Sequence, residues 1–339
     1  MSCVLRPATL DDLDALYELA KLTGGGFTNL PPNRETLSVK LARATEALTH
    51  DVDEHRDDLF VFVLENTETG QVRGTCQIFT TVGQHWPFYS YRIGTLTQYS
   101  QELARTFRAD MLTLSTDLEG ASEVGGLFLH PRERAGGLGM LLARSRYLFI
   151  KRHRTRFSDR TLAELRGVID EAGGSHFWDG LAGKFFGMSF QEADEFNATA
   201  GNQFIADLMP KHPIYTAMLP DSARAVIGVP HPSGRAAMRM LETEGFHHDK
   251  YVDIFDGGPT MVAHTDRIRS IMDSLESRVV RVGGVTGERR LATAGRLASW
   301  RAAYAEIELL QAGEIAIDEA SAKLLGVREG DTVIHVGRT

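Results

Sequence analysis

One segment of the chain combines residue types that together can bind an anion. Residues 122–142 read SEVGGLFLHPRERAGGLGMLL, which is an apolar strand, a His-Pro step, a glycine-rich turn and an apolar helix. Glycines let the chain turn tightly and bring backbone N–H groups together, and the N-terminus of the following helix adds positive potential. We therefore predict that Arg134, Gly136, Gly137 and Gly139 form a binding turn for a pyrophosphate.

The same residues exclude two common nucleotide sites. The Gly-Lys-Ser/Thr ending of a nucleoside-triphosphate loop is missing, and the turn does not follow the G-x-G-x-x-G pattern of dinucleotide-binding proteins. A glycine turn with no ligand, simply joining a strand to a helix, remains the alternative. The elements that must position the turn are a strand over residues 122–129 and a helix over residues 139–152.

The composition of the chain restricts its partners. Its 339 residues contain 37 Lys and Arg against 45 Asp and Glu, a formal net charge of −8. Nucleic acids and anionic membrane surfaces attract net positive charge, so we expect neither as the main partner. Cys3 and Cys76 suggest neither a disulfide framework nor a metal site. Without an apolar leader or a run of about 18 apolar residues, a cytoplasmic protein is expected.

The periodicity of apolar residues predicts a mixed α/β chain. We expect a helix over residues 34–49, a β-hairpin over residues 59–82, and a strand-like segment over residues 161–169 that contains Glu164 and Arg166. A helix over 176–186, a strand over 251–255 and a helix over 266–277 follow. The glycine-rich stretch after residue 277 suits a boundary, and the tail beyond it suggests a small β-rich module. At roughly 150 residues per domain, the length predicts about two domains and a remainder.

The glycine turn resembles the acyl-CoA-binding motif of the GNAT N-acyltransferases. Arg134-x-x-Gly137-x-Gly139 is similar to the family pattern Q/R-x-x-G-x-G/A, and residues 4–19 resemble the first strand and helix of that fold. The resemblance implies an α/β (α+β) GNAT-like fold. Residues 236–246 resemble a second GNAT ending, which suggests a duplicated unit. We expect an acyl-CoA-binding domain over 1–190, a second half over 191–278 that carries His231, and a barrel-like module over 279–339.

Six longer peptides resemble the arginine N-succinyltransferase family. They are residues 21–31, 91–96, 163–171, 195–196, 208–215 and 251–260, and the similarity extends from about residue 2 to 275, more weakly to 339. The resemblance implies direct transfer of a succinyl group from succinyl-CoA to the α-amine of L-arginine, the first step of the arginine succinyltransferase pathway. Succinyl-CoA is then a co-substrate, and no tightly bound cofactor is expected. No nucleophilic serine or cysteine is required if both substrates bind together.

The resemblance also implies roles for three residues. The family's proton donor stands in a Val-His-Pro context that matches His231, although Pro230 replaces the usual valine. Glu123 lies eleven residues before the arginine of the turn, at the offset of a catalytic glutamate in the histone-acetyltransferase branch. Leu127 matches a succinyl-CoA-binding leucine, with its main-chain N–H as the functional group. Which of His231 and Glu123 is the base stays open, and a structural role remains the alternative for each.

The charges of the substrates indicate further candidates. The succinyl carboxylate needs a cation, for which Arg92, Arg166 and Lys211 are candidates. The guanidinium of arginine pairs well with a carboxylate in a bidentate geometry, for which Asp253 and Asp256 are candidates. Glu164 could contact a substrate or form a salt bridge with Arg166. Each of these residues also fits an ordinary structural role.

Two other functions are compatible with the same residues. The first is a related N-acyltransferase that acts on ornithine or another amine, because the sequence does not fix the amine pocket. The second is a non-catalytic CoA- or arginine-sensing protein that kept the fold, although the intact Arg134, Gly137, Gly139 and His231 argue against it. The C-terminal module has no evident chemistry, and assembly into a homo-oligomer is one role considered for it.

Overall fold

The computed structural model describes residues 3–23, 27–134, 136–200, 203–311 and 313–338, and the chain divides into two compact units. The first unit contains residues 1–80, 122–159 and 264–339, and the second contains residues 81–121 and 160–263. Each unit is therefore built from separated segments. The sequence analysis expects three continuous domains, over 1–190, 191–278 and 279–339. These differ from the two discontinuous units, and the domain boundaries stay a prediction. Residues 24–26 and Ala135, which belong to the family-like segments, lie outside the described residues.

The sheet of the first unit has four antiparallel strands in the order β1–β2–β3–β6. The elements of this part are β1 (Cys3–Pro7), α1 (Leu13–Lys21), α2 (Arg34–Thr49), β2 (Leu59–Asn66), β3 (Val72–Phe79), β6 (Ser122–Leu129) and α3 (Leu138–Arg152). Helix α2 begins where predicted because the Asn33 side chain accepts the N–H of Thr36. Its buried Leu37 and Leu41 pack with Val61 of β2 in one apolar cluster. The expected strand over 122–129 is confirmed as β6.

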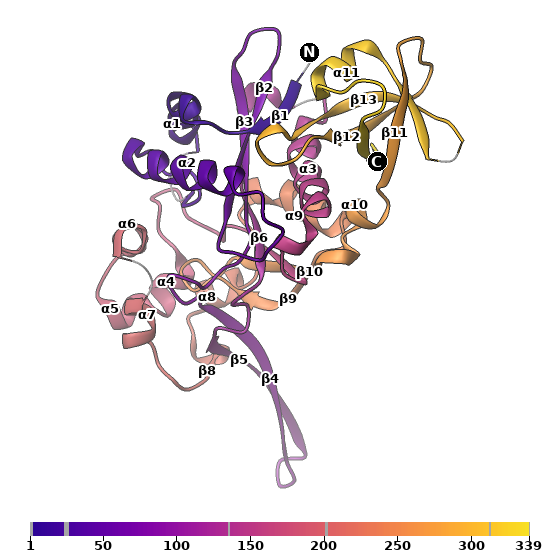
Figure 1. Ribbon diagram of the computed structural model, residues 1–339. Coiled ribbons are helices and arrows are strands. Elements are labelled where there is room, and N and C mark those ends of the chain that lie inside the picture. Colours follow the sequence, from indigo (N-terminus) through magenta and orange to yellow (C-terminus); the bar gives the residue numbers. More distant parts are fainter. Residues whose placement is uncertain (1–2, 24–26, 135, 201–202, 312, 339) are drawn as a thin grey trace. The chain divides into compact units, whose positions relative to one another are not determined.

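The C-terminal part of the first unit is a closed five-stranded barrel. It contains α10 (Arg269–Met272), β11 (Leu275–Val282), β12 (Glu288–Ala294), β13 (Arg301–Leu309), β14 (Glu314–Ile317), α11 (Glu319–Leu325) and β15 (Thr332–Gly337), drawn in orange and yellow in Figure 1. The strand order is β12–β15–β11–β14–β13, and β13 pairs back to β12. Buried alanines and β-branched side chains fill the interior, including Val279, Ala292, Ala303 and Ile315. The barrel-like module expected from the sequence is thus confirmed.

The second unit combines a sheet with several short helices. Its sheet order is β7–β10–β9–β4–β5–β8. The elements are β4 (Ser90–Ser100), β5 (Arg105–Ser115), β7 (Arg160–Glu164), α4 (His176–Gly180), α5 (Gly183–Phe186), α6 (Phe190–Ala200), α7 (Gln203–Leu208), β8 (Ile214–Tyr215), α8 (Asp221–Val226), α9 (Arg235–Thr243), β9 (His247–Val252) and β10 (Pro259–His264). The indole of Trp178 stacks on Phe186 and Phe255 with ring centroids 5.6 Å apart in both pairs, and this cluster forms the core.

Several elements differ from the sequence-based expectations. The segment over 161–169 is a strand only as far as Glu164, so Arg166 lies in the following loop. The helix over 176–186 is two short helices, because Leu181 adopts φ −128° and ψ −87° and leaves the helical region. The strand near residue 251 ends at Val252, where Asp253 starts a turn. The helix over 266–277 ends at Met272, and β11 follows.

The long hairpin of β4 and β5 is an element that the sequence pattern did not predict. The two strands pair from Ser90↔Ser115 to Ser100↔Arg105, and Figure 1 draws them as an extended ribbon. Side chains on both faces of its outer half are exposed, so the apolar and polar residues do not alternate as in a half-buried strand. Among the described residues, no helix is both long and apolar enough to cross a membrane.

Candidate active site

A β-bulge in β6 distinguishes the strand that carries Glu123. Gln77 of β3 lies opposite Gly125 and Thr75 lies opposite Phe128, so Gly126 and Leu127 together face a single residue of β3. Gly126 adopts φ +58°, a left-handed conformation that favours glycine in such bulges. A bulge leaves one residue out of the strand ladder, and its N–H is then free to meet a ligand. Leu127, expected from the sequence to offer its main-chain N–H, lies in this bulge.

The carboxyl group of Glu123 is buried beside polar groups from three other elements. Its residue is 7% exposed, and its Oε1 accepts a long hydrogen bond of 3.5 Å from the Asn29 side chain. The carbonyl of Asn29 in turn accepts hydrogen bonds from Gln77 Nε2 at 2.8 Å and from Lys40 Nζ at 2.6 Å. A Cβ at Gly125 would lie 2.8 Å from Glu123 Oε1, so glycine makes room for the carboxyl group.

The surroundings of Glu123 change its acidity. Burial raises the pKa of Glu123 to about 7, although the Asn29 hydrogen bond and the charges of Lys40 and Arg146 act in the opposite direction. Burial lowers the pKa of the Lys40 ammonium to about 8, against the attraction of Glu123. A carboxyl group with such a pKa exchanges its proton near neutral pH, as a general base or acid must.

Two glycines of the turn before α3 adopt left-handed conformations. Gly136 has φ +74°, and Gly137 has φ +85° and is the N-cap of α3, with no side chain capping the helix. The first N–H groups of a helix have no acceptor inside the helix, and they point out of its N-terminus. A Cβ added at Gly136 or Gly139 would meet nothing within 4 Å, so the turn has an open side. Arg134 is exposed at its beginning.

The opposite side of this turn contacts the barrel. The hydroxyl of Tyr304 on β13 donates to the carbonyl of Gly137 at 3.1 Å, and Arg338 Nη2 donates to the carbonyl of Gly136 at 3.3 Å. The Arg338 guanidinium lies over the Tyr304 ring, 5.1 Å from its centroid. Burial raises the pKa of the Tyr304 phenol, so its hydroxyl remains a donor at neutral pH.

In the second unit, three loops bring His231 and Arg166 together. The backbone N–H of His231 donates to the Arg166 carbonyl at 2.7 Å, and Gly167 forms a β-bridge with Pro230. The N–H of Gly228 donates to the Gly257 carbonyl at 2.8 Å, and this hydrogen bond joins the third loop, between β9 and β10, to the other two. The close packing at this point requires Gly167, because a Cβ there would lie 2.4 Å from the Asp256 carbonyl oxygen.

The His231 ring has a defined protonation pattern. The N–H of Ser233 donates to Nδ1 at 3.3 Å, and the Ser233 hydroxyl lies 2.7 Å from the same atom. Because a backbone N–H can only donate, Nδ1 is an acceptor, and the proton of the neutral ring is on Nε2. Partial burial and the charge of Arg166 lower the pKa of His231. The Nε of Arg166 is itself buried and has no hydrogen-bond partner within the described ranges.

Asp253 and Asp256 are already engaged with the backbone. One carboxylate oxygen of Asp253 accepts the N–H groups of Phe255 and Asp256 at 2.7 and 2.8 Å. The two oxygens of Asp256 accept the N–H groups of Gly167 and Gly258 at 2.7 and 2.8 Å. Burial and its like-charged neighbour Asp253 raise the pKa of Asp256 well above its usual value. These contacts favour a role in fixing the loops, and guanidinium binding by either residue stays a prediction.

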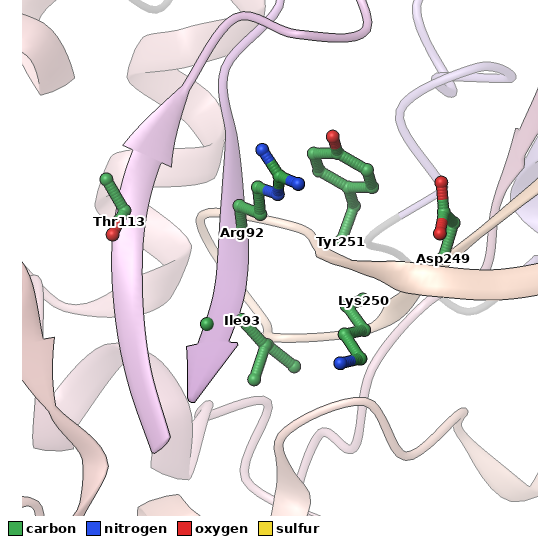
Figure 2. Close-up of a pocket in the computed structure, with 7 residues that line it drawn as sticks. Arg92, Ile93, Thr113, Asp249, Lys250 and Tyr251 are labelled. Carbon is green, nitrogen blue, oxygen red and sulfur yellow. The ribbon is translucent and has the colours of Figure 1, made fainter. Parts of the chain in front are cut away.

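Arg92 lines a cavity of about 520 Å³ at the base of the β4–β5 hairpin, together with Ile93, Gly94, Thr113, Asp249, Lys250 and Tyr251. The side chains of Arg92 and Tyr251 point the same way, whereas those of Ile93 and Lys250 point the opposite way (Figure 2). Asp117 accepts from Arg92 at 3.4 Å and from the Tyr251 hydroxyl at 3.0 Å. The charged groups of Arg92 and Lys250 therefore point to different sides and do not converge on one ligand position. Glu164 and Lys211 are exposed elsewhere in this unit.

Sequence reasoning missed the residues that surround Glu123. Asn29, Lys40 and Gln77 are far apart along the chain. Asn29 bonds the carboxyl group, and Lys40 and Gln77 bond the carbonyl of Asn29, which only the pairing of β3 with β6 and the packing of α2 allow. It also missed Tyr304 and Arg338, which no motif marks. The signal available in the sequence for the bulge was the pair of adjacent glycines, Gly125 and Gly126, inside an otherwise apolar strand. Within the described ranges, no group of three or more His, Cys, Asp or Glu side chains is arranged to hold a metal ion.

Comparisons with known proteins define the chain as an acyltransferase, and it belongs to the arginine N-succinyltransferase family. The family described as arginine N-succinyltransferase beta subunit matches residues 3–270, and its C-terminal domain matches residues 277–337. An arginine N-succinyltransferase of Escherichia coli O1:K1 is 47% identical over 279 residues, covering 82% of this chain and 80% of that protein. The sequence-based interpretations of family and enzyme class are confirmed.

A solved structure shares the fold over the full length. It is arginine/ornithine succinyltransferase subunit AI from Pseudomonas aeruginosa, which matches with a TM-score of 0.90 and 32% identity and covers 100% of this chain and 99% of that chain. The mixed α/β fold with its C-terminal barrel is thus a property shared with this relative. The duplication of a GNAT unit and the roles of individual residues stay predictions.

Proposed function

We propose that this protein transfers the succinyl group of succinyl-CoA to the α-amine of L-arginine and releases CoA. Each substrate amine must lose a proton when it attacks the thioester, the tetrahedral intermediate needs hydrogen-bond donors for its oxyanion, and the departing thiolate gains a proton. The described residues include a candidate group for each of these tasks, and none of the tasks needs a covalent enzyme intermediate.

Glu123 is the proposed general base. Its carboxyl group is buried, with a pKa raised by burial to about 7, so the ionised form is available at neutral pH and still holds a proton well enough to accept one. The main-chain N–H of Leu127, in the bulge of the same strand, is the proposed oxyanion donor. The turn with Gly136, Gly137 and Gly139 holds the pyrophosphate of the CoA moiety through its backbone N–H groups.

His231 is the proposed proton donor to the CoA thiolate. In the neutral ring Nδ1 accepts the N–H of Ser233, so Nε2–H is left to donate a hydrogen bond to the thiolate. Transfer of the proton itself takes the imidazolium form, which returns to the neutral ring as the thiol leaves. The neighbouring Arg166, whose Nε is buried without a partner among the described residues, is the proposed partner of the succinyl carboxylate. A guanidinium suits this task because it offers two parallel N–H donors to a carboxylate.

The observation that carries the proposal is the buried carboxyl group of Glu123 on a bulged strand, which the short turn Pro131–Glu133 connects to the glycine turn. The names of the relatives support the choice of substrates. The direct test follows thiol release from succinyl-CoA by the purified protein with arginine, ornithine or lysine as acceptor, and identifies the acylated nitrogen by mass spectrometry. Arginine-dependent thiol release with acylation at the α-nitrogen is expected. No release with any of the three amines would favour a binding or sensing protein instead.

Ornithine is a second candidate acceptor because the structural relative from Pseudomonas aeruginosa is an arginine/ornithine succinyltransferase. Arginine and ornithine share the α-amine and the α-carboxylate and differ only at the cationic end. The ratio of kcat/KM for the two amines, measured in the same assay, decides between them. An ornithine value equal to or above the arginine value would replace arginine as the proposed substrate.

A further inference from the structure

The C-terminal barrel contacts the glycine turn through two side chains that the proposed reaction does not otherwise use. Tyr304 comes from β13, and Arg338 follows the last barrel strand β15. Their donor atoms meet the carbonyls of Gly137 and Gly136 at 3.1 and 3.3 Å. The Arg338 guanidinium lies on the Tyr304 ring, so the two side chains also position each other. All of these residues belong to the first unit.

The geometry of the peptide bond converts these contacts into an orientation of the turn. In a planar trans peptide, the C=O of one residue and the N–H of the next point in opposite directions. The carbonyl of Gly137 accepts both the N–H of Leu141 in α3 and the Tyr304 hydroxyl at 3.1 Å, so the helix and the barrel together fix this peptide plane, and the N–H of Leu138 points away from both. The carbonyl of Gly136 is held towards the barrel by Arg338, which turns the N–H of Gly137 to the same open side. These are among the donors that the proposed pyrophosphate site requires.

We propose that Tyr304 and Arg338 are positioning residues for acyl-CoA binding, through which the C-terminal barrel holds the N–H groups of Gly137 and Leu138 towards the phosphates. Gly136 and Gly137 both adopt left-handed conformations, and glycine is free to leave such a conformation when nothing holds its peptide plane. The helix shares in holding the carbonyl of Gly137, whereas the carbonyl of Gly136 lies outside the helix and is held by Arg338. A loop that is already oriented loses less conformational freedom when it binds. The barrel thus has a part in the reaction without touching the reacting atoms. This inference rests on the proposed function of the turn.

The test compares Tyr304→Phe, Arg338→Gln and Arg338→Ala with the unmodified enzyme. Tyr304→Phe keeps the ring and removes only the donor, whereas Arg338→Gln keeps an amide donor without the charge. We expect KM for succinyl-CoA and Kd for CoA to rise about fivefold in Tyr304→Phe and Arg338→Ala, the size of one lost hydrogen bond, with kcat and KM for arginine unchanged. Partial recovery of CoA affinity in Arg338→Gln would identify the hydrogen bond, and not the charge alone, as the positioning contact.

A truncated substrate separates positioning from general loss of structure. Succinyl-pantetheine carries the same thioester but lacks the diphosphate, so its kcat/KM should not differ between the variants and the unmodified enzyme. The matched control is Arg289→Ala, which removes a cation 5.4 Å from the Tyr304 ring centroid without touching the turn. It should leave both substrates unaffected. An equal loss with both substrates would assign Tyr304 and Arg338 a purely structural role and overturn the inference.

The outcomes also separate this inference from the proposed function. If the unmodified protein binds CoA and releases thiol, but the variants retain full CoA affinity, the barrel does not position the turn and only the inference fails. If the unmodified protein neither binds CoA nor releases thiol from succinyl-CoA, the proposed function fails, and with it the basis of the inference.

Discussion

The two units contain the same local structure around a His-Pro step. In the first unit, the backbone N–H of His130 donates to the carbonyl of Arg73, and the ring Nδ1 accepts the N–H of Arg132. In the second unit, His231 donates to the carbonyl of Arg166, and its Nδ1 accepts the N–H of Ser233. Each histidine caps a short 3-10 turn, Pro131–Glu133 and Pro232–Gly234, and each turn precedes a helix.

The arginine beside each histidine makes the difference. Arg73 is paired with Glu133 through nitrogen–oxygen distances of 3.0 Å, so its charge is already used within the protein. The Nε of Arg166 is buried and has no partner in the part of the chain that the structure describes. A buried, unsatisfied donor costs free energy, and a ligand that accepts its hydrogen bond recovers it. In the first unit, the turn after His130 thus connects strand β6 to the glycine turn. In the second unit, the same local structure places His231 beside Arg166, whose Nε is free to bind a ligand.

The largest expected effect comes from removing each histidine in turn. His231→Ala should lower kcat about 10²- to 10⁴-fold because it removes the proposed proton donor, while Kd for CoA stays the same. His130→Ala, the matched control, should change kcat less than about threefold, because it removes a capping group rather than a proton donor. Steady-state kinetics and CoA titration measure both. Equal losses in the two variants would break the distinction between the two turns.

A smaller effect is expected from the glycines that precede the two helices. Gly137 has φ +85°, and a Cβ there would lie 3.2 Å from Arg338 Nη2, so Gly137→Val is strained by its backbone and crowded as well. We expect KM for succinyl-CoA to rise about 30-fold. Gly234 has φ −84°, and a Cβ there would meet only Pro230 Cβ at an ordinary contact distance of 4.0 Å, so Gly234→Ala should leave KM within about twofold. Normal CoA affinity in Gly137→Val would refute the pyrophosphate site.

The smallest expected effect is a dependence of kcat/KM on pH, caused by the carboxyl group of Glu123 in the first unit. Because burial raises the pKa of Glu123 to about 7, kcat/KM should rise about tenfold between pH 6 and pH 8 as the carboxyl group ionises. Partial burial and the charge of Arg166 lower the pKa of His231, whose titration therefore lies on the acid side of that of Glu123. The pH profile of kcat/KM, measured with Glu123→Gln as the control, tests the assignment. A rise of the same size in Glu123→Gln would exclude Glu123 as its source.

The same shift has a consequence for stability with a defined sign. The pKa of Glu123 is higher in the folded chain than its ordinary value of 4.5, so the folded state binds the proton more tightly between that value and about 7. The free energy of unfolding should therefore fall as the pH rises through this window. Glu123→Gln should remove this part of the decrease, which urea denaturation at several pH values can measure.

The parts of the fold that sequence predicted well are those with one buried face. Helix α2 and strand β6 have the expected bounds because their apolar residues face a core and their ends carry capping or turn residues. The outer half of the β4–β5 hairpin has no such pattern, because solvent reaches both of its faces there. Strand β11 overlaps the end of the helix that the sequence predicts over 266–277, because the alternation of buried and exposed residues in β11 is short.

The candidate site follows the same division. The glycine turn and Glu123 belong to one continuous segment, and local spacing together with the family resemblance was enough to select them. Asn29 bonds Glu123 and is itself bonded by Lys40 and Gln77, contacts that depend on sheet pairing and helix packing, so no single short motif contains all three residues. The contacts of Asp256 show the reverse case, in which a charge selected as a substrate ligand is occupied by the backbone of its own loops.

The bulge at Gly126 and Leu127 makes the proposed site depend on the number of residues in one strand. Successive side chains of a strand alternate between its two faces, so one residue more or fewer reverses every face that follows. Deleting Gly126 would restore a regular ladder with β3. The residues between the deletion and the glycine turn would then face the opposite side of the sheet relative to Glu123. A single-residue deletion there should therefore be tolerated far less well than a substitution, although it removes no side chain at all.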